Sequence, residues 1–255
     1  MRFSILGSGS RGNSVFIESG KTAILIDAGF SGKEIHNRLR SIGRDLSEIR
    51  ALCITHEHND HICGVGVIAR RFGIPAYANP GTFAGGDKKI GKVGNRMEFE
   101  TGNILQIDDL EVRSFRISHD TSDPVGFLVS DGKVSLGYCT DTGQVSRLIA
   151  TRLAKCNGLI LEFNHNLAML KNGPYPLSLQ QRVRSSQGHL CNEDAAELLA
   201  QLIGDHLRIA VLAHLSETNN TPELARAAAL QAVAEWGSTS LVIASQEKSL
   251  PLTEI

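Results

Sequence analysis

Apolar and polar residues along this chain follow strand-like and helix-like patterns in turn. Short β-branched runs at 14–19 and 22–29 predict two strands separated by a turn. Helical spacing at 32–42 and from about 60 to 72 predicts helices, the second ending at Gly73, and the apolar run at 51–55 between them predicts a buried strand. Strand-like runs then dominate from about 97 to 138.

The second half of the chain repeats an order of strand followed by helix. Strands are predicted at 158–163, 207–212 and 240–244, with a helix at about 192–203 between the first two. Thr221 before Pro222 combines an N-cap residue with proline at the first helical position, and so predicts the start of another helix. The segment 173–184 and the basic segment 87–96 are interpreted as solvated loops.

These elements predict a four-layer α/β sandwich. Each half supplies a mostly antiparallel or mixed sheet with helices on one side, so two sheets would pack together inside two helical layers, an αββα arrangement. No linker-like segment separates the halves. We therefore expect one domain over residues 1–255.

Composition excludes several classes of protein. Lys and Arg total 26 against 27 Asp and Glu, so no overall field draws the chain to nucleic acid or to an anionic membrane. The 5 cysteines are odd in number and lack a CxxC spacing, which favours a reduced compartment. The sequence shows no signal-peptide pattern and no apolar run of roughly 18 residues, so we expect a cytoplasmic protein without a membrane partner. Oligomeric state stays open.

The segment from Gly7 to Gly12 matches the GxGxxG pattern of dinucleotide-binding sites, but its context does not. That fingerprint requires a helix after the glycines, whereas a strand-like run follows here. The segment is therefore interpreted as a hairpin loop between two antiparallel strands.

The strongest chemical signal is the sequence Thr-His-Glu-His-Asn-Asp-His, which follows the buried strand directly. His56 and His58 alternate on an extended turn and can share one cation, while Asp60 and His61 begin the next element and can face a second cation. Imidazole and carboxylate ligands with open positions are typical of catalytic metal sites.

Three further residues are candidates for completing such a site. His119, Asp141 and His214 each lie at or near the end of an apolar, strand-like run. Ends of this kind are where ligands carried on loops converge.

Nearly the whole chain resembles the metallo-β-lactamase superfamily in its motifs and their order. These motifs are Asp27, the HxHxDH segment, His119, Asp141 and His214. The resemblance implies an αββα fold and two divalent metal ions, zinc or else manganese or iron. It places His56, His58 and His119 on one ion and Asp60, His61 and His214 on the other. Asp141 would bridge both ions, and Asp27 would be structural. A hydroxide bridging the metals would be the nucleophile.

Details of the motifs favour phosphodiester hydrolysis. Zinc β-lactamases of the best-known class carry cysteine at the position of Asp141, and the segment between Asp141 and His214 is too short for the cap domain of larger nucleases. The segment GHLCNEDAA resembles one in transfer-RNA 3′-processing enzymes whose histidine helps to protonate the leaving oxygen. The predicted catalytic residues are this histidine, His189, and Asp60 of the HxHxDH segment.

Within the superfamily, the chain resembles the YycJ/WalJ group in a set of five motifs: LGSGSRGNS, THEHxDH, ExNH, GHLxxxxAA and HLSxxNNxPE. That group implies a nuclease that degrades DNA in the 5′ to 3′ direction, so nucleic acid, DNA above all, is the expected partner. Polar residues near the same strand ends are candidates for binding the substrate: Arg11, Asn164, His165, Ser216, Asn219 and Asn220. Whether His165 contacts metal or substrate stays open.

Two alternatives stay open at this point. The same metals would serve a hydrolase of small substrates, either a cyclic or nucleotide phosphodiesterase or a thioesterase similar to glyoxalase II. A non-catalytic metal-binding scaffold is the third reading, although scaffolds of that kind characteristically lose ligands and all seven are present here.

Overall fold

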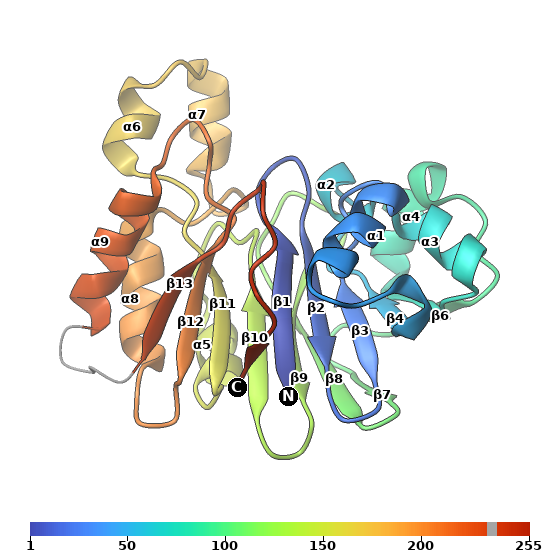
Figure 1. Cartoon of the computed structure of the whole chain (residues 1–255). Helices are drawn as coiled ribbons and strands as arrows, with labels where there is room; N and C mark the ends of the chain where they lie inside the picture. The colour runs from blue at the N-terminus through green and yellow to red at the C-terminus, as the bar shows by residue number, and fades with distance from the viewer. Residues whose placement is uncertain (234–238) are drawn as a thin grey trace.

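A computed structural model describes residues 1–233 and 239–255 of the chain and shows two mixed sheets packed face to face (Figure 1). The strands of the first sheet are β1 Arg2–Gly7, β2 Ser14–Glu18, β3 Ala23–Ile26, β4 Ile49–Cys53, β5 Ala76–Ala78, β6 Arg96–Glu98 and β14 Thr253–Glu254. Their spatial order is β14-β1-β2-β3-β4-β5-β6.

The second sheet comes from the middle and the end of the chain. Its strands are β7 Ile104–Ile107, β8 Leu110–Arg116, β9 Val125–Ser130, β10 Ser135–Cys139, β11 Gly158–Glu162, β12 Ile209–Ala213 and β13 Ser240–Ile243. Their order is β13-β12-β11-β10-β9-β8-β7.

Helices lie on the outer faces of both sheets. The helices are α1 Gly32–Ser41, α2 Asn59–Ile62, α3 Val65–Phe72, α4 Pro80–Ile90, α5 Arg147–Leu153, α6 Leu167–Asn172, α7 Leu177–Val183, α8 Asn192–Leu202 and α9 Pro222–Val233, with a 3₁₀ turn at Leu46–Glu48. α6 and α7 project beyond one end of the sandwich (Figure 1).

Three apolar clusters hold these layers together. Phe3 and Ile17 from the first sheet meet Phe127 and Ile160 from the second in the cluster between the sheets. A second cluster packs α1 and α3 against the outer face of the first sheet, and a third packs α5, α8 and α9 against the second. Each buried strand therefore carries apolar side chains on both faces, which explains its uninterrupted apolar run. The predicted αββα sandwich is confirmed.

Parallel strands determine where the loops converge. β3 is parallel to β4, and β11 is parallel to both β10 and β12. Parallel neighbours end at the same edge of a sheet, so the residues after these strands come together. The predicted hairpin at Gly7 to Gly12 is confirmed, because β1 and β2 pair in the antiparallel sense on either side of it.

Three local predictions agree with the structure only in part. The helical segment at 60–72 is two helices, because the N–H of Gly64 donates to Ala28 O at 2.7 Å and a Cβ on Gly64 would lie 2.3 Å from Phe30 O. The basic segment 87–96 begins inside α4, whose several glycines conceal the helical pattern. The segment 173–184 contains α7, which starts directly after Pro176.

The cluster between the sheets gives a test of the packing. Phe127 is fully buried there, with its ring centroid 6.1 Å from that of Phe99. Phe127→Ala leaves a cavity and should lower the free energy of unfolding by about 3–5 kcal/mol. The midpoint of urea unfolding measures this change. Phe72, which is 37% exposed, supplies the control, since Phe72→Ala should have a much smaller effect. Equal midpoints for the two variants would contradict the described packing.

Candidate metal centre

The loops after β3, β10 and β12 place three acidic or imidazole side chains at the strand ends through an unusual backbone conformation. Asp27, Asp141 and His214 have φ angles of 59°, 59° and 55°. Residues other than glycine rarely adopt this left-handed region, and such conformations persist where the surrounding structure holds them. The backbone thus turns sharply at the end of each strand.

The structure brings all seven predicted metal ligands together. His56, His58 and His119 form one group in which one donor atom from each residue lies within 4.8 Å of the others, and Asp60, His61 and His214 form a second. Asp141 lies between the groups. Its Oδ2 is 3.4 Å from His61 Nε2, and its Oδ1 is 3.4 Å from His214 Nε2 and 4.0 Å from His119 Nε2.

Most of these imidazole rings are fixed by a partner on the side away from the group. His56 Nδ1 lies 3.0 Å from Thr55 Oγ1, and His119 Nδ1 lies 3.1 Å from the carbonyl oxygens of Gln187 and Gly188. A partner on one ring nitrogen fixes the tautomer and leaves the other nitrogen to face a metal.

Asp27 fixes His61 in the same way. The N–H and hydroxyl groups of Thr55 both donate to the Asp27 carboxylate at 2.8 Å, and His61 Nδ1 donates to it at 2.7 Å. Asp27 is fully buried, and burial raises the pKa of its carboxyl, while His61 and Thr55 oppose this shift. Burial alone would lower the pKa of His61, but Asp141, Asp27 and Asp60 raise it to about 9. These contacts agree with a structural role for Asp27.

Glu162 is a central residue to which the sequence interpretation gave no specific role. Its Oε1 accepts hydrogen bonds from His214 Nδ1 at 3.0 Å and from His189 Nδ1 at 2.7 Å. Its Oε2 accepts from the N–H groups of Thr142 and Leu190. A lone carboxylate at the end of the apolar strand Gly-Leu-Ile-Leu-Glu was the available signal, because a buried charge requires partners.

The buried donor atoms fit divalent cations. Among the described residues, His56 Nε2, His214 Nε2 and Asp141 Oδ2 are buried and have no hydrogen-bond partner. Burial lowers the pKa of His56 well below its usual value, which keeps the ring neutral and its lone pair available. Imidazole and carboxylate groups arranged in this way suit zinc, manganese or iron.

His189 lies beside both groups, and it is partly exposed. Its ring centroid is 5.0 Å from that of His119 and 5.2 Å from that of His214, and its Nδ1 is 3.8 Å from Asp141 Oδ1. Because Nδ1 donates to Glu162, the Nε2 atom is the one left for other partners. The predicted catalytic pair, Asp60 and His189, thus borders the same small volume.

The predicted substrate-binding residues have different environments. Asn164 Nδ2 donates to His214 O at 2.9 Å, and Asn220 Nδ2 donates to Phe163 O at 2.8 Å. Ser216 Oγ accepts from Asn219 N at 3.1 Å. Asn164, Asn219 and Asn220 are buried, and their described contacts hold the turns beside His214.

His165 is also buried, and burial lowers its pKa to about 4. Its Nδ1 has no hydrogen-bond partner among the described residues. It belongs to none of the groups of potential metal ligands found in the described part of the chain.

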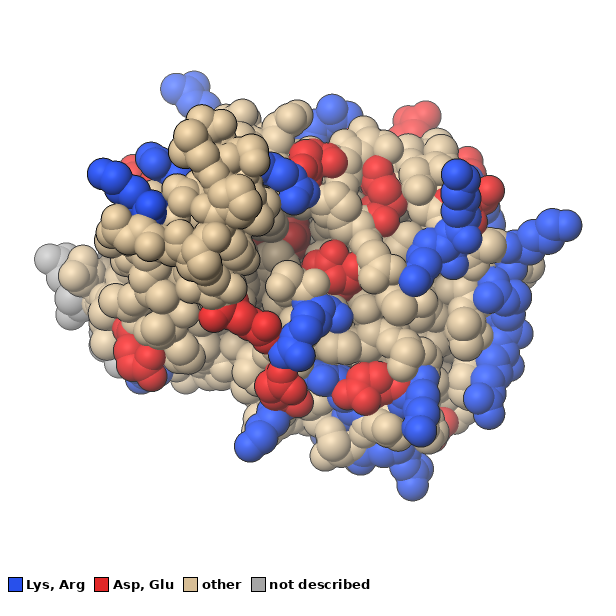
Figure 2. Space-filling view, turned by 90° about the horizontal axis from the view of Figure 1, so that it is seen from above, with Lys and Arg blue, Asp and Glu red and all other residues tan. Residues whose placement is uncertain are grey.

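Arg11 is paired with carboxylates. Its Nη2 lies 2.5 Å from Glu217 Oε1 and also contacts Glu247 Oε1, and all three side chains are about half exposed or more. Seen from above the strand ends, acidic side chains occupy the centre of this face, and most lysine and arginine side chains lie toward its outer edge (Figure 2). The charge of Arg11, a predicted substrate-binding residue, is therefore compensated within the protein.

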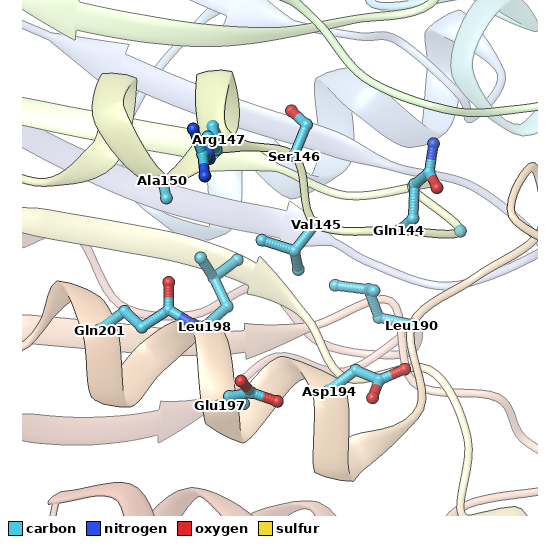
Figure 3. Close-up of a pocket in the computed structure, with 11 residues that line it drawn as sticks. Gln144, Val145, Ser146, Arg147, Ala150, Leu190, Asp194, Glu197, Leu198 and Gln201 are labelled. Atoms are coloured by element: carbon cyan, nitrogen blue, oxygen red, sulfur yellow. The ribbon is translucent and has the colours of Figure 1, made fainter.

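A separate pocket of about 370 Å³ lies between the start of α5 and one side of α8 (Figure 3). Gly143 and Leu190, which line it, lie close in sequence to Asp141 and His189, but the predicted metal ligands do not line it. Within the described residues, every helix is too short or too polar to cross a membrane.

Comparison with known proteins agrees with this geometry. The family model of the metallo-β-lactamase superfamily matches residues 7–187. Exodeoxyribonuclease YycJ of Bacillus anthracis is 37% identical over 239 residues, which cover 93% of this chain and 90% of that protein. Exodeoxyribonuclease WalJ of Streptococcus pneumoniae is 38% identical over an alignment of 263 residues, which covers 100% and 98% of the two chains.

Solved structures support the fold. The metallo-β-lactamase fold protein YhfI from Bacillus subtilis aligns with a TM-score of 0.75 at 15% identity, over 98% of both chains. The short form of human tRNase Z aligns with a TM-score of 0.68 at 16% identity, over 100% of both chains. The resemblance seen in the motifs is thus confirmed over the length of the chain, and this chain belongs to the metallo-β-lactamase superfamily.

Proposed function

We propose that this protein is a metal-dependent phosphodiesterase that degrades DNA from an end, in the 5′ to 3′ direction. The observation that carries the proposal is the pair of donor groups with Asp141 lying between them. The names of the relatives from B. anthracis and S. pneumoniae, both exodeoxyribonucleases, support DNA as the substrate.

The residues present would hold two divalent ions. His56, His58 and His119 would hold one, and Asp60, His61 and His214 the other, with Asp141 shared. Such ions supply activation of water and stabilisation of charge on phosphoryl oxygens. Asp60 Oδ2 lies 3.5 Å from His61 Nε2 and 3.8 Å from His214 Nε2, which places it in the second group, and from there it would also orient the attacking water.

His189 would donate a proton to the leaving oxygen. Glu162 accepts from His189 Nδ1, which fixes the ring and directs Nε2 away from Glu162. The same Glu162 oxygen accepts from His214 Nδ1. One buried carboxylate therefore aligns a proposed proton donor with a proposed metal ligand.

Charge around the centre favours hydrolysis at the end of a DNA strand over binding along a DNA duplex. Formal net charge is −1, and Arg11 and Arg182 are both paired with carboxylates. Binding along a duplex uses many phosphate contacts to unpaired cations. The same facts support the second candidate, a hydrolase of small phosphodiesters. The residues predicted to bind the substrate remain proposed in that role: Arg11, Asn164, His165, Ser216, Asn219 and Asn220.

The central position of Asp141 predicts a specific defect. Asp141→Ala removes the carboxylate shared by both groups, so metal content should fall below two ions per chain and DNA hydrolysis should be lost. Elemental analysis after dialysis measures the metal content. The control, Asp205→Ala, changes an exposed aspartate and should retain both the metal content and DNA hydrolysis. Two tightly bound ions in Asp141→Ala would contradict the assignment.

The role of His189 predicts a defect in rate alone. His189→Ala should keep the metal content of the wild type and reduce turnover by about 10² or more, as expected for loss of a general acid. Turnover at saturating substrate is the measurement. His36→Ala alters a histidine on α1 and serves as the control. A wild-type rate in His189→Ala would make this histidine structural.

The choice of substrate has a direct assay. Metal-reconstituted protein is incubated with 5′-labelled and 3′-labelled single- and double-stranded DNA and RNA, and with bis(p-nitrophenyl) phosphate. We expect progressive loss of DNA from the 5′ end, with none in Asp141→Ala. Hydrolysis of the small diester alone would transfer the assignment to the small-molecule phosphodiesterase.

A further inference from the structure

Asp120 is a charged residue beside the metal centre that belongs to none of the donor groups. Its Oδ1 lies 3.7 Å from His58 Nε2 and 3.5 Å from His119 Nε2. Its side chain is 30% exposed, and its Oδ2 accepts from Arg182 Nε at 2.6 Å.

His58 differs from the other histidines of the two groups. His56, His61, His119 and His214 each have a partner for Nδ1, which leaves Nε2 to face the group. In His58 it is Nδ1 that faces the group, at 3.2 Å from His119 Nε2. Its Nε2 faces Asp120, and 3.7 Å is slightly longer than a hydrogen bond, so a small side-chain rotation would complete the contact.

The chain from α7 to His189 contacts the loop that carries His119 at several points. Arg182 binds Asp120, Ser118 Oγ donates to Ser186 O at 2.7 Å, and His119 Nδ1 faces the carbonyl oxygens of Gln187 and Gly188. The Arg182 contact therefore belongs to a set that fixes one loop against another. α7 in turn belongs to the part that projects beyond the sheets (Figure 1).

We propose that Asp120 is a positioning residue that fixes His58 through Nε2, and that Arg182 holds Asp120 in place. A neutral imidazole that binds a metal through Nδ1 carries its proton on Nε2, and a carboxylate is the preferred acceptor for that proton. The inference rests on the proposed metal centre. It makes α7 a structural part of that centre.

Zinc affinity tests this role independently of catalysis. In competition with a chromophoric chelator, Asp120→Ala should bind one of its two zinc ions about 10–100-fold more weakly than the wild type. Asp120→Asn, which keeps an acceptor oxygen and the shape of the side chain, should recover part of the loss. Arg182→Gln should weaken the same ion by a smaller factor, and Arg184→Gln, at the end of the same helix, should bind zinc like the wild type.

A spectroscopic measurement separates positioning from a general effect on folding. In the zinc-loaded protein, long-range proton–nitrogen NMR should show His58 protonated on Nε2, and this proton should exchange with water faster in Asp120→Ala. Circular dichroism checks that the variants are folded. If Asp120→Ala is not folded, the same measurement is made on Asp120→Asn.

Two results would overturn the inference, and they can be told apart by whether the wild-type chain binds metal. Wild-type zinc affinity and an unchanged His58 signal in Asp120→Ala would refute the role of Asp120 and leave the metal centre intact. Failure of the wild-type chain to take up zinc, manganese or iron would refute the metal centre and the inference with it.

Discussion

The structure depends on the compensation of three buried carboxylates. Asp27, Asp141 and Glu162 are almost fully enclosed at the ends of the central strands, where an unpaired charge is very unfavourable. His61 lies between Asp27 and Asp141, and His214 lies between Asp141 and Glu162. Acid and imidazole groups thus alternate across both sheets, and a cation placed among them would complete the balance of charge.

This alternation explains why the strand ends accept unfavourable backbone angles. Asp27, Asp141 and His214 adopt left-handed conformations, which cost of order 1–3 kcal/mol each. Parallel strands alone would bring the loops together, but they would not aim these side chains. The energy comes from packing between and outside the sheets, so a stable sandwich supports a strained centre.

The sequence predicted the layers and the donor groups because both depend on local signals. Apolar runs marked the buried strands, and HxHxDH marked the loop that carries four of the seven clustered donor residues. The paired state of Arg11 was not predictable, because Glu217 and Glu247 approach it from distant loops. Likewise, Pro174 and Pro176 suggested a loop where α7 forms, and only the fold shows that Arg182 reaches Asp120.

Charge around the centre limits how a polyanion can approach. Asp60 lies in the second donor group, while Asp120 and Glu217 neutralise Arg182 and Arg11 beside it, so these two cations are not free to bind a long phosphate backbone laid across the centre. The end of a DNA strand presents few phosphates. Divalent ions in the donor groups would also offset much of the nearby negative charge. The same balance makes binding of a polyanion depend on metal content, so the donor groups would influence which substrate enters as well as which bond breaks.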